Sequence, residues 1–436
     1  MKKATLTSIA LISASCLSMG TALASSDSIN DLDNDQNNWA KVRATLNANL
    51  DAVTEEVELT SAAIGNSFAA ELGGRTNIVN DQALGLRPNG QQFFNNNVTA
   101  NVNLHATDTV GSISATAAAI GNSASITVDD PQGGASRLTQ VTNNQVDYTA
   151  GARARIDATI AGSDETVELT SAAINNSFSA DVTGNARITN TQFGVANNDA
   201  IATTNLTAYD TVGAIAGTTA AIGNSAAIAF DNDLNPGTSG SSLINNNQFV
   251  RGQSEIAANL NVNGSNLSGP DGVAIETTAA AIANSFSVEG EGSLVSNNLQ
   301  RFNGDARAVA NLTLDDITGD VTHTSAAIAN SASYDIENAD HVTINNRQWA
   351  SYDPTAITNA TFGEIDGDVS LTSAAITNTL SVSTLPSTAV LDVNTQQYNG
   401  ALTQAVVNAD IGDVTGNVSI TAAAIGNTVN IVNLPN

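Results

Sequence analysis

The sequence predicts an all-β protein, a parallel β-solenoid (β-helix) built from eight imperfect repeats. The first observation is a phrase, Ala-Ala-Ile-x-Asn-Ser/Thr, that recurs along the chain with 46 to 60 residues between successive isoleucines. The second is a glutamine, usually beside an aromatic residue, that precedes each isoleucine at a nearly constant distance. The third is the alternation of β-branched and polar residues around each phrase. Repeats of this length are typical of stacked, quasi-one-dimensional architectures.

In a stacked solenoid, each repeated position becomes a column of identical side chains, and amide columns can hydrogen-bond along the stack. Three such columns are expected to form a structural ladder. The isoleucine column comprises Ile64, Ile120, Ile174, Ile222, Ile282, Ile328, Ile376 and Ile425. The asparagine column comprises Asn66, Asn122, Asn176, Asn224, Asn284, Asn330, Asn378 and Asn427. The glutamine column comprises Gln36, Gln92, Gln145, Gln192, Gln248, Gln300, Gln348 and Gln397.

Each repeat is expected to supply three or four short strands that are joined by turns. In the last repeat, Val418 and Ile420 share one face of a strand while Ser419 and Thr421 take the other. A short helix through the alanines is the rival interpretation, but six residues without a cap rarely form a helix alone. An Asp-x-x-Gly turn, as in Asp108 to Gly111, separates the strands. With strands this short, we expect about two coils per repeat and a central, buried isoleucine column.

The N-terminus predicts export. Residues 1–24 have a basic start, an apolar stretch and an Ala-x-Ala site, which is typical of a cleaved signal peptide. A membrane anchor and a lipoprotein signal at Cys16 are the alternatives. Residues 25–35 are expected to be a flexible lead, and residues 36–436 one solenoid domain. A chain cleaved after Ala24 has no cysteine, so disulfides cannot stabilise it.

The formal net charge of −28 disfavours nucleic acid as a partner, because binding phosphates requires clustered Lys and Arg. Acidic charge keeps a protein soluble, and it also attracts cations. Calcium is therefore the one cofactor that the sequence suggests. The EF-hand pattern fails, however, since Gln36 and Val42 stand where Gly and Glu are required. The weak calcium candidates are Asp31, Asp33, Asp35, Asp315, Asp316 and Asp320.

Catalytic chemistry is not expected. His105, His323 and His341 lie at unrelated places in their repeats, which favours solvated or turn positions over a catalytic role. The sequence contains no nucleophile elbow, no zinc-protease motif and no phosphate loop. We therefore expect a protein without catalytic residues.

The repeats resemble those of secreted bacterial functional-amyloid subunits, the curli and Fap families. The resemblance covers Gln36 to Ile431 and rests on regularly placed Asn, Gln, Gly, Ala and apolar residues. It is one of repeat style, because the curlin spacing Ser-x5-Gln-x4-Asn-x5-Gln is not kept. The resemblance implies a subunit of an extracellular fibre.

Two functions follow from these observations. The first is a secreted structural subunit that self-associates into surface or biofilm fibres on a bacterium, with outer-membrane secretion or anchoring machinery as a further partner. The alternative is a monomeric solenoid adhesin that binds a surface, a polysaccharide or calcium through insertion loops such as 87–90 and 231–242. In repeat proteins, such loops project from one face and often bind ligands.

Overall fold

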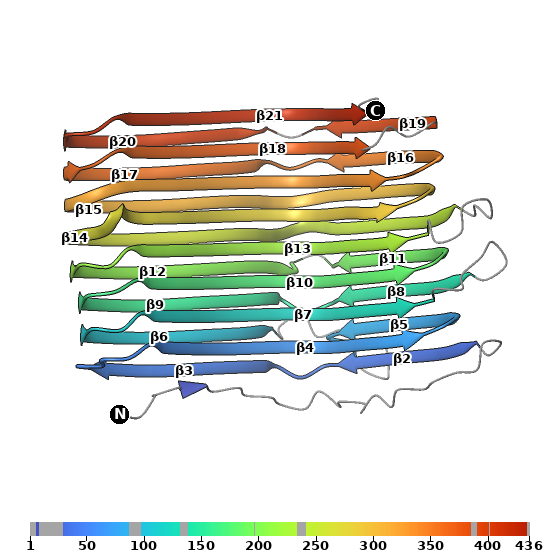
Figure 1. Cartoon of the computed structure of the whole chain (residues 1–436), viewed down its shortest axis with the longest axis horizontal. Helices are drawn as coiled ribbons and strands as arrows, with labels where there is room; N and C mark the ends of the chain where they lie inside the picture. The colour runs from blue at the N-terminus through green and yellow to red at the C-terminus, as the bar shows by residue number, and fades with distance from the viewer. Residues whose placement is uncertain are drawn as a thin grey trace.

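The computed structural model describes residues 6–7, 29–86, 97–130, 138–195, 197–232, 241–384, 390–400 and 402–433. These residues form parallel strands that wind into a right-angled stack of coils, and the paired strands of successive coils lie directly above one another (Figure 1). Every pairing between strands is parallel, as in a β-solenoid. The predicted fold class is confirmed.

Three ladders of strands make up the coils. The first contains β2 (Asn30–Asn38), β5 (Thr76–Leu84), β8 (Thr139–Asp147), β11 (Ala186–Gly194), β16 (His341–Ala350) and β19 (Val390–Asn399). The second contains β3 (Val42–Asp51), β6 (Val98–Thr109), β9 (Gly151–Ser163), β12 (Asp199–Thr211), β17 (Pro354–Asp366) and β20 (Gln404–Val414). The third contains β4 (Val57–Gly73), β7 (Ile113–Asp129), β10 (Val167–Thr183), β13 (Ile215–Asp231), β18 (Val369–Thr384) and β21 (Val418–Asn433).

Two long strands complete the stack. β14 (Ser242–Glu291) and β15 (Leu294–Glu337) each run through a whole coil and pair with all three ladders. A two-residue strand, β1 (Leu6–Thr7), pairs with β4 at the N-terminal end. β2 begins at Asn30, so residues 30–35 belong to the first coil and not to the flexible lead that we expected.

Each repeat forms one coil, so the expectation of about two coils per repeat is wrong. Gln145 pairs directly with Gln192, and Ile174 pairs directly with Ile222, which are the matching residues of consecutive repeats. The physical reason is strand length. A third-ladder strand such as β10 has 17 residues, and one turn of the solenoid therefore uses the whole repeat.

The coil is flattened into two layers. The long strands of the third ladder span the molecule, while the first and second ladders lie end to end behind them and run the opposite way (Figure 1). One apolar cluster fills the space between the second ladder and the first half of the third, as at Val167 and Ile156. Another fills the space between the first ladder and the second half of the third, as at Ile188 and Phe178.

Alternation along the third ladder changes phase at one position. In β10, Ala173 points inward and Ile174 outward, but the next two residues, Asn175 and Asn176, are both buried. The same double-buried step recurs in the other described coils up to β18, and the register skips its first residue. Such a two-residue step is the geometry of a β-bulge, which bends the strand and redirects the side chains that follow.

The described strands contain no helix, and none of the described residues form a helix long and apolar enough to cross a membrane.

Candidate functional site

A polar seam joins the two layers between the apolar clusters. On the first ladder, the side chain of Gln248 donates one N–H to Gln192 Oε1 at 2.8 Å and the other to the carbonyl of Ser285 on the third ladder at 2.8 Å. Both donors of the amide are therefore used, one along the stack and one across it. The other glutamines of the seam make the same pair of contacts wherever a preceding coil exists, as Gln145 and Gln397 do.

The asparagine column returns the contact from the opposite layer. Asn284 donates one N–H to Asn330 Oδ1 at 2.8 Å and the other to the carbonyl of Arg301, which follows Gln300 on the first ladder, at 3.1 Å. Gln300 in turn donates to the carbonyl of Ser331. Because a buried amide is costly unless its donors are paired, this reciprocal bonding explains why Asn-Ser and Gln recur together in the sequence.

The glutamine column differs from the predicted one at a single member. Gln82 takes the second place, where it donates to Gln36 Oε1 at 3.1 Å and accepts from Gln145 at 2.8 Å. Gln92 lies outside the described residues. The spacing rule selected Gln92 because the chain between β5 and β6 is longer in this repeat, which places Gln82 farther from Ile120 than the other glutamines are from their isoleucines.

The predicted isoleucine column is formed, but it does not lie in the core. Ile64 to Ile425 align in register on the third ladder and point outward, half-buried within the column and more exposed at its two ends. The expectation of a central buried column is wrong, because the buried members of the phrase are the preceding alanine and the following asparagine, such as Ala221 and Asn224.

Two further asparagine ladders were not predicted. One is buried on the first ladder and runs through Asn143, Asn190 and Asn246, with donor–acceptor distances of 2.7 Å. The other is on the outer face of the second ladder and runs through Asn205, Asn261 and Asn311. The Ala-x-x-Asn piece of each repeat carried the signal for the outer one.

The calcium candidates do not form a cluster. Asp31, Asp33 and Asp35 alternate along the exposed side of β2, where an extended strand holds them apart. Asp315 and Asp320 instead accept backbone N–H groups of the next coil, from Glu364 at 3.3 Å and Asp368 at 2.8 Å. Among the described residues, no group of three or more His, Cys, Asp or Glu side chains is arranged to hold a metal ion.

His323 contradicts the expectation of solvated histidines. It lies on β15 with no exposed surface, between Thr277 Oγ1 at 2.9 Å from Nδ1 and Ser325 Oγ at 2.7 Å from Nε2. Ser325 donates its own proton to the carbonyl of Ile357, so its oxygen accepts from His323. Burial lowers the pKa of His323 to about 4. His105 and His341 are exposed, as expected.

An aromatic column on the outer face of the first ladder was also missed. The rings of Phe193 and Phe249 lie 6.0 Å apart, and those of Trp349 and Tyr398 lie 4.6 Å apart. The guanidinium of Arg301 lies between these pairs, 5.3 Å from the ring of Phe249 and 5.9 Å from that of Trp349. The aromatic residue after each glutamine was the sequence signal for this column.

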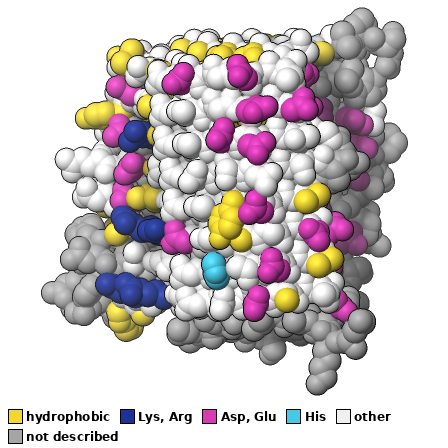
Figure 2. Space-filling model, turned by 90° about the vertical axis from the view of Figure 1, so that its left-hand side faces the viewer, with side chains coloured by type: hydrophobic (Ala, Val, Ile, Leu, Met, Phe, Trp, Pro, Cys, Tyr) yellow, Lys and Arg dark blue, Asp and Glu magenta, His cyan; other side chains and the backbone are white. Residues whose placement is uncertain are grey.

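The C-terminal end of the stack is open. Val418, Ile420 and Ile431 point along the core columns of the last coil, yet they are 45–47% exposed. Their counterparts one coil earlier, such as Val369 and Leu371, are at most 1% exposed. A row of hydrophobic side chains at the top of Figure 2 marks this end.

Comparison with known proteins gives one match. Residues 232–434 match the model of a family described as holdfast attachment protein D (HfaD). This match indicates a bacterial protein related to surface adhesion. No curated protein and no solved structure matches the chain. The resemblance to curli and Fap subunits has no support from these comparisons and remains a resemblance of repeat style.

Proposed function

We propose that this protein is a secreted subunit of a bacterial surface-attachment structure and that its copies join end to end into fibres. The match to the holdfast attachment model supports the adhesive role. The shape and chemistry of the two ends of the solenoid support the assembly.

The open C-terminal coil is the observation that carries the proposal. It presents the apolar cross-section of the core together with the unpaired edges of β19, β20 and β21. An exposed strand edge with apolar neighbours is a template for another chain. The first coil of a second copy offers strands of the same lengths and register, which makes the contact head-to-tail and open-ended.

The polarity of the amide ladders makes the two ends complementary. In the glutamine column, each side chain donates toward the N-terminal end, so Gln397 ends the described ladder with a carbonyl and Gln36 begins it with a spare N–H. In the asparagine column the direction is reversed, so Asn427 ends the ladder as a donor and Asn66 begins it with a carbonyl. Stacking two copies head to tail therefore continues both ladders.

Export would prepare the N-terminal end for this contact. β1, which pairs with β4 through Leu59 and Thr60, lies inside the predicted signal peptide. Its removal leaves the edge of β4 unpaired, ready to accept a strand of another copy.

Negative-stain electron microscopy of the purified, processed protein tests the proposal. We expect fibres whose diffraction shows the ~4.7 Å spacing of stacked strands along the fibre axis. Discrete rods one molecule long, unchanged at high concentration and with added calcium, would contradict it.

The second candidate is a monomeric adhesin. The exposed aromatic column from Phe193 to Tyr398 favours it, because exposed stacked rings on a rigid sheet are typical of recognition surfaces. The loops 87–90 and most of 231–242, which we expected to bind, lie outside the described residues. Rods in the microscope that adhere to a surface, and lose adhesion when Trp349 and Tyr398 are replaced by alanine, would support this candidate.

A further inference from the structure

The outer face of the third ladder is as regular as the core, although burial does not require it to be. Reading outward positions along each strand, every coil presents Thr, Ala, Ile and Ser/Thr in the same order, as Thr218, Ala220, Ile222 and Ser225 do on β13. We call this surface the Thr–Ala–Ile face. The outward positions of the first and second ladders vary from coil to coil, as Phe249, Arg301 and Trp349 illustrate.

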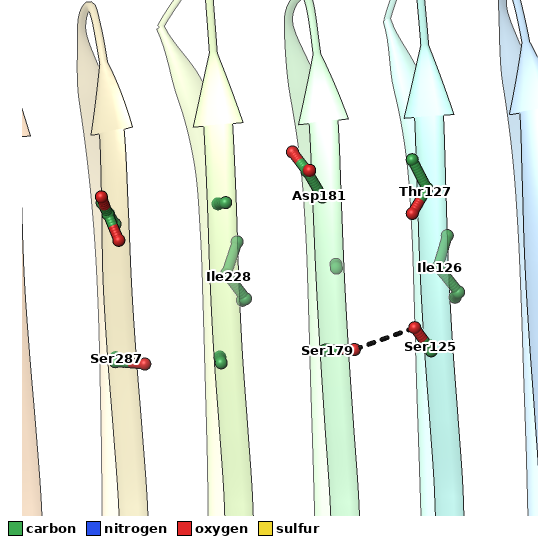
Figure 3. Close-up of a pocket in the computed structure, with 11 residues that line it drawn as sticks. Ser125, Ile126, Thr127, Ser179, Asp181, Ile228 and Ser287 are labelled. Carbon is green, nitrogen blue, oxygen red and sulfur yellow. Dashed lines mark hydrogen bonds between the residues drawn. The ribbon is translucent and has the colours of Figure 1, made fainter.

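Charge borders the Thr–Ala–Ile face and is absent from its centre. Its four columns contain no charged side chain in any coil. Carboxylates appear on one side at Glu168 and Glu276, and on the other at Asp181 and Glu289. In Figure 3, Asp181 lies at the outer end of a shallow groove beyond the serine pair Ser179 and Ser125, whose hydroxyls are 3.2 Å apart. A neutral centre with a charged rim is the anatomy of a protein interface.

Positive charge is confined to the opposite layer. Among the described residues, no Lys or Arg lies on a third-ladder strand, whereas the first and second ladders expose arginines on their outer side. Figure 2 shows the edge between the layers, with Lys and Arg gathered along one side and Asp and Glu spread over the rest. Arg153 and Arg155 are paired with Asp199 and Asp157. The other outward arginines of these ladders, which we call the arginine side, are Arg43, Arg187, Arg251, Arg301, Arg307 and Arg347.

The dimensions suit a stable contact. From the threonine column to the serine column and its outward neighbour, the face spans about ten residues, or roughly 30 Å at ~3.3 Å per residue. Eight coils at ~4.8 Å make it roughly 40 Å tall. The face therefore offers on the order of 1,200 Å² per copy, which meets the size of specific interfaces.

We propose that a second copy of this protein packs side by side on the first, with the Thr–Ala–Ile face of one copy against the arginine side of the next. The acidic rim of one copy then meets the arginines of the other, and the neutral columns meet without burying a charge. Pairing two Thr–Ala–Ile faces would instead bring two acidic rims together. The contact is front to back and therefore continues laterally from copy to copy, independently of end-to-end growth.

Two complementary variants test this arrangement. The face variant, Ala172→Glu with Ala280→Glu, places charges at half-buried outward positions two coils apart. The side variant is Arg307→Glu with Arg347→Glu, at exposed positions. Both are made in a background with Ile420→Asp and Ile431→Asp at the open end, so that end-to-end growth does not contribute. The control, Thr127→Glu, adds a charge in the column that already holds Asp181 and Glu289.

Sedimentation velocity then measures lateral association. We expect the background protein and the Thr127→Glu control to form lateral oligomers, and each variant alone to stay a single solenoid. An equimolar mixture of the face and side variants should form dimers, because one retains the arginine side and the other the Thr–Ala–Ile face. Dimers of the side variant alone would show face-to-face pairing and overturn the arrangement. A single-solenoid background protein at every concentration, even if its face adsorbs to an ordered surface, would overturn self-pairing itself.

Discussion

At the scale of single residues, the seam amides explain most of the repeat. A primary amide has two N–H donors, and in the seam one runs along the stack while the other crosses to the opposite layer. Glutamine does this from one layer and asparagine from the other. A shorter or apolar side chain at either position would leave a carbonyl and two donors buried without partners, which is why neither position tolerates drift between coils.

Replacing Gln248 with alanine tests this account. The change strands Gln192 Oε1, an N–H of Gln300 and the carbonyl of Ser285, all in buried positions. Leaving such groups unpaired costs about 1–3 kcal/mol each at most, so we expect the free energy of unfolding to fall by about 2–4 kcal/mol. Urea unfolding measures this. Gln140→Ala, at an exposed position of the same ladder, is the control and should change little.

The position of Gln248 also revises its role in assembly. Because its side chain is buried, its loss should weaken the monomer and fibre growth together. Normal monomer stability combined with slow assembly would show that the column acts between copies instead.

Histidine burial predicts a pH dependence. The unfolded chain holds His323 at its ordinary pKa of 6.5, whereas burial lowers the folded value to about 4. Below pH 6.5 the unfolded state therefore binds a proton that the folded state does not. Stability should fall as the pH drops from 6.5 to about 4, by about 3 kcal/mol in total.

Comparison of variants isolates this effect from the many carboxylates. In His323→Gln, urea unfolding at pH 7 and pH 4 should differ by about 3 kcal/mol less than in the unchanged protein. His105→Gln, at an exposed position, should keep the full difference. If both variants behave alike, the titrating group is elsewhere.

At the scale of elements, the corners depend on glycine for a steric reason. At the end of the Asp-x-x-Gly turn before β13, a Cβ on Gly213 would lie 1.8 Å from the carbonyl oxygen of Glu165 in the coil below. The turn was predicted at the right place, but Asp210 has a φ of 53° and so adopts the left-handed conformation instead of opening a type I turn. Asp tolerates that conformation better than most residues.

Gly213→Ala should therefore destabilise the protein by about 3 kcal/mol, because backbone atoms of two stacked corners must separate. Gly73→Ala is the matched control, since its added Cβ would meet nothing closer than 4.0 Å. Thermal unfolding of both variants checks this. A similar loss in both would mean that backbone entropy, and not the contact with Glu165, sets the requirement for glycine.

Strand type and repeat boundaries could be predicted from the sequence, but the inward and outward faces could not. In the phrase around Ile222, one alternation gives Thr219 and Ala221, and the other gives Ala220 and Ile222. Both sets are small or apolar, so the pattern alone does not say which is buried. The two-residue step at Gly223 and Asn224 changes the phase again, and only the paired layers show it. Gln82 was missed for a related reason, because a longer connection moved it out of the regular spacing.

At the scale of the whole molecule, stability and assembly depend on the same repeated interface. Each coil buries its edges and its core columns against the next, and the last described coil has no neighbour to do so. Adding a copy at that end makes the same contacts that hold the solenoid together. The acidic charge opposes this growth, because each copy carries a formal net charge of −28. We therefore expect assembly to accelerate with added salt, which screens charge repulsion. Light scattering across a series of NaCl concentrations measures this rate.

Substitutions at the open end separate assembly from folding. Ile420→Asp with Ile431→Asp places two carboxylates on core columns that are already 45–47% exposed in the single molecule, so the unfolding midpoint should change little. A second copy docked on this end would bury both charges without partners, which is far costlier than leaving them in water. We expect fibres to disappear from electron micrographs while the monomer stays folded. Ser419→Asp with Asn430→Asp adds the same charge on the outward side of the same strand and should leave fibres intact. Fibres of the first variant would show that growth uses a different surface, whereas loss of fibres in both would indicate a general effect of charge.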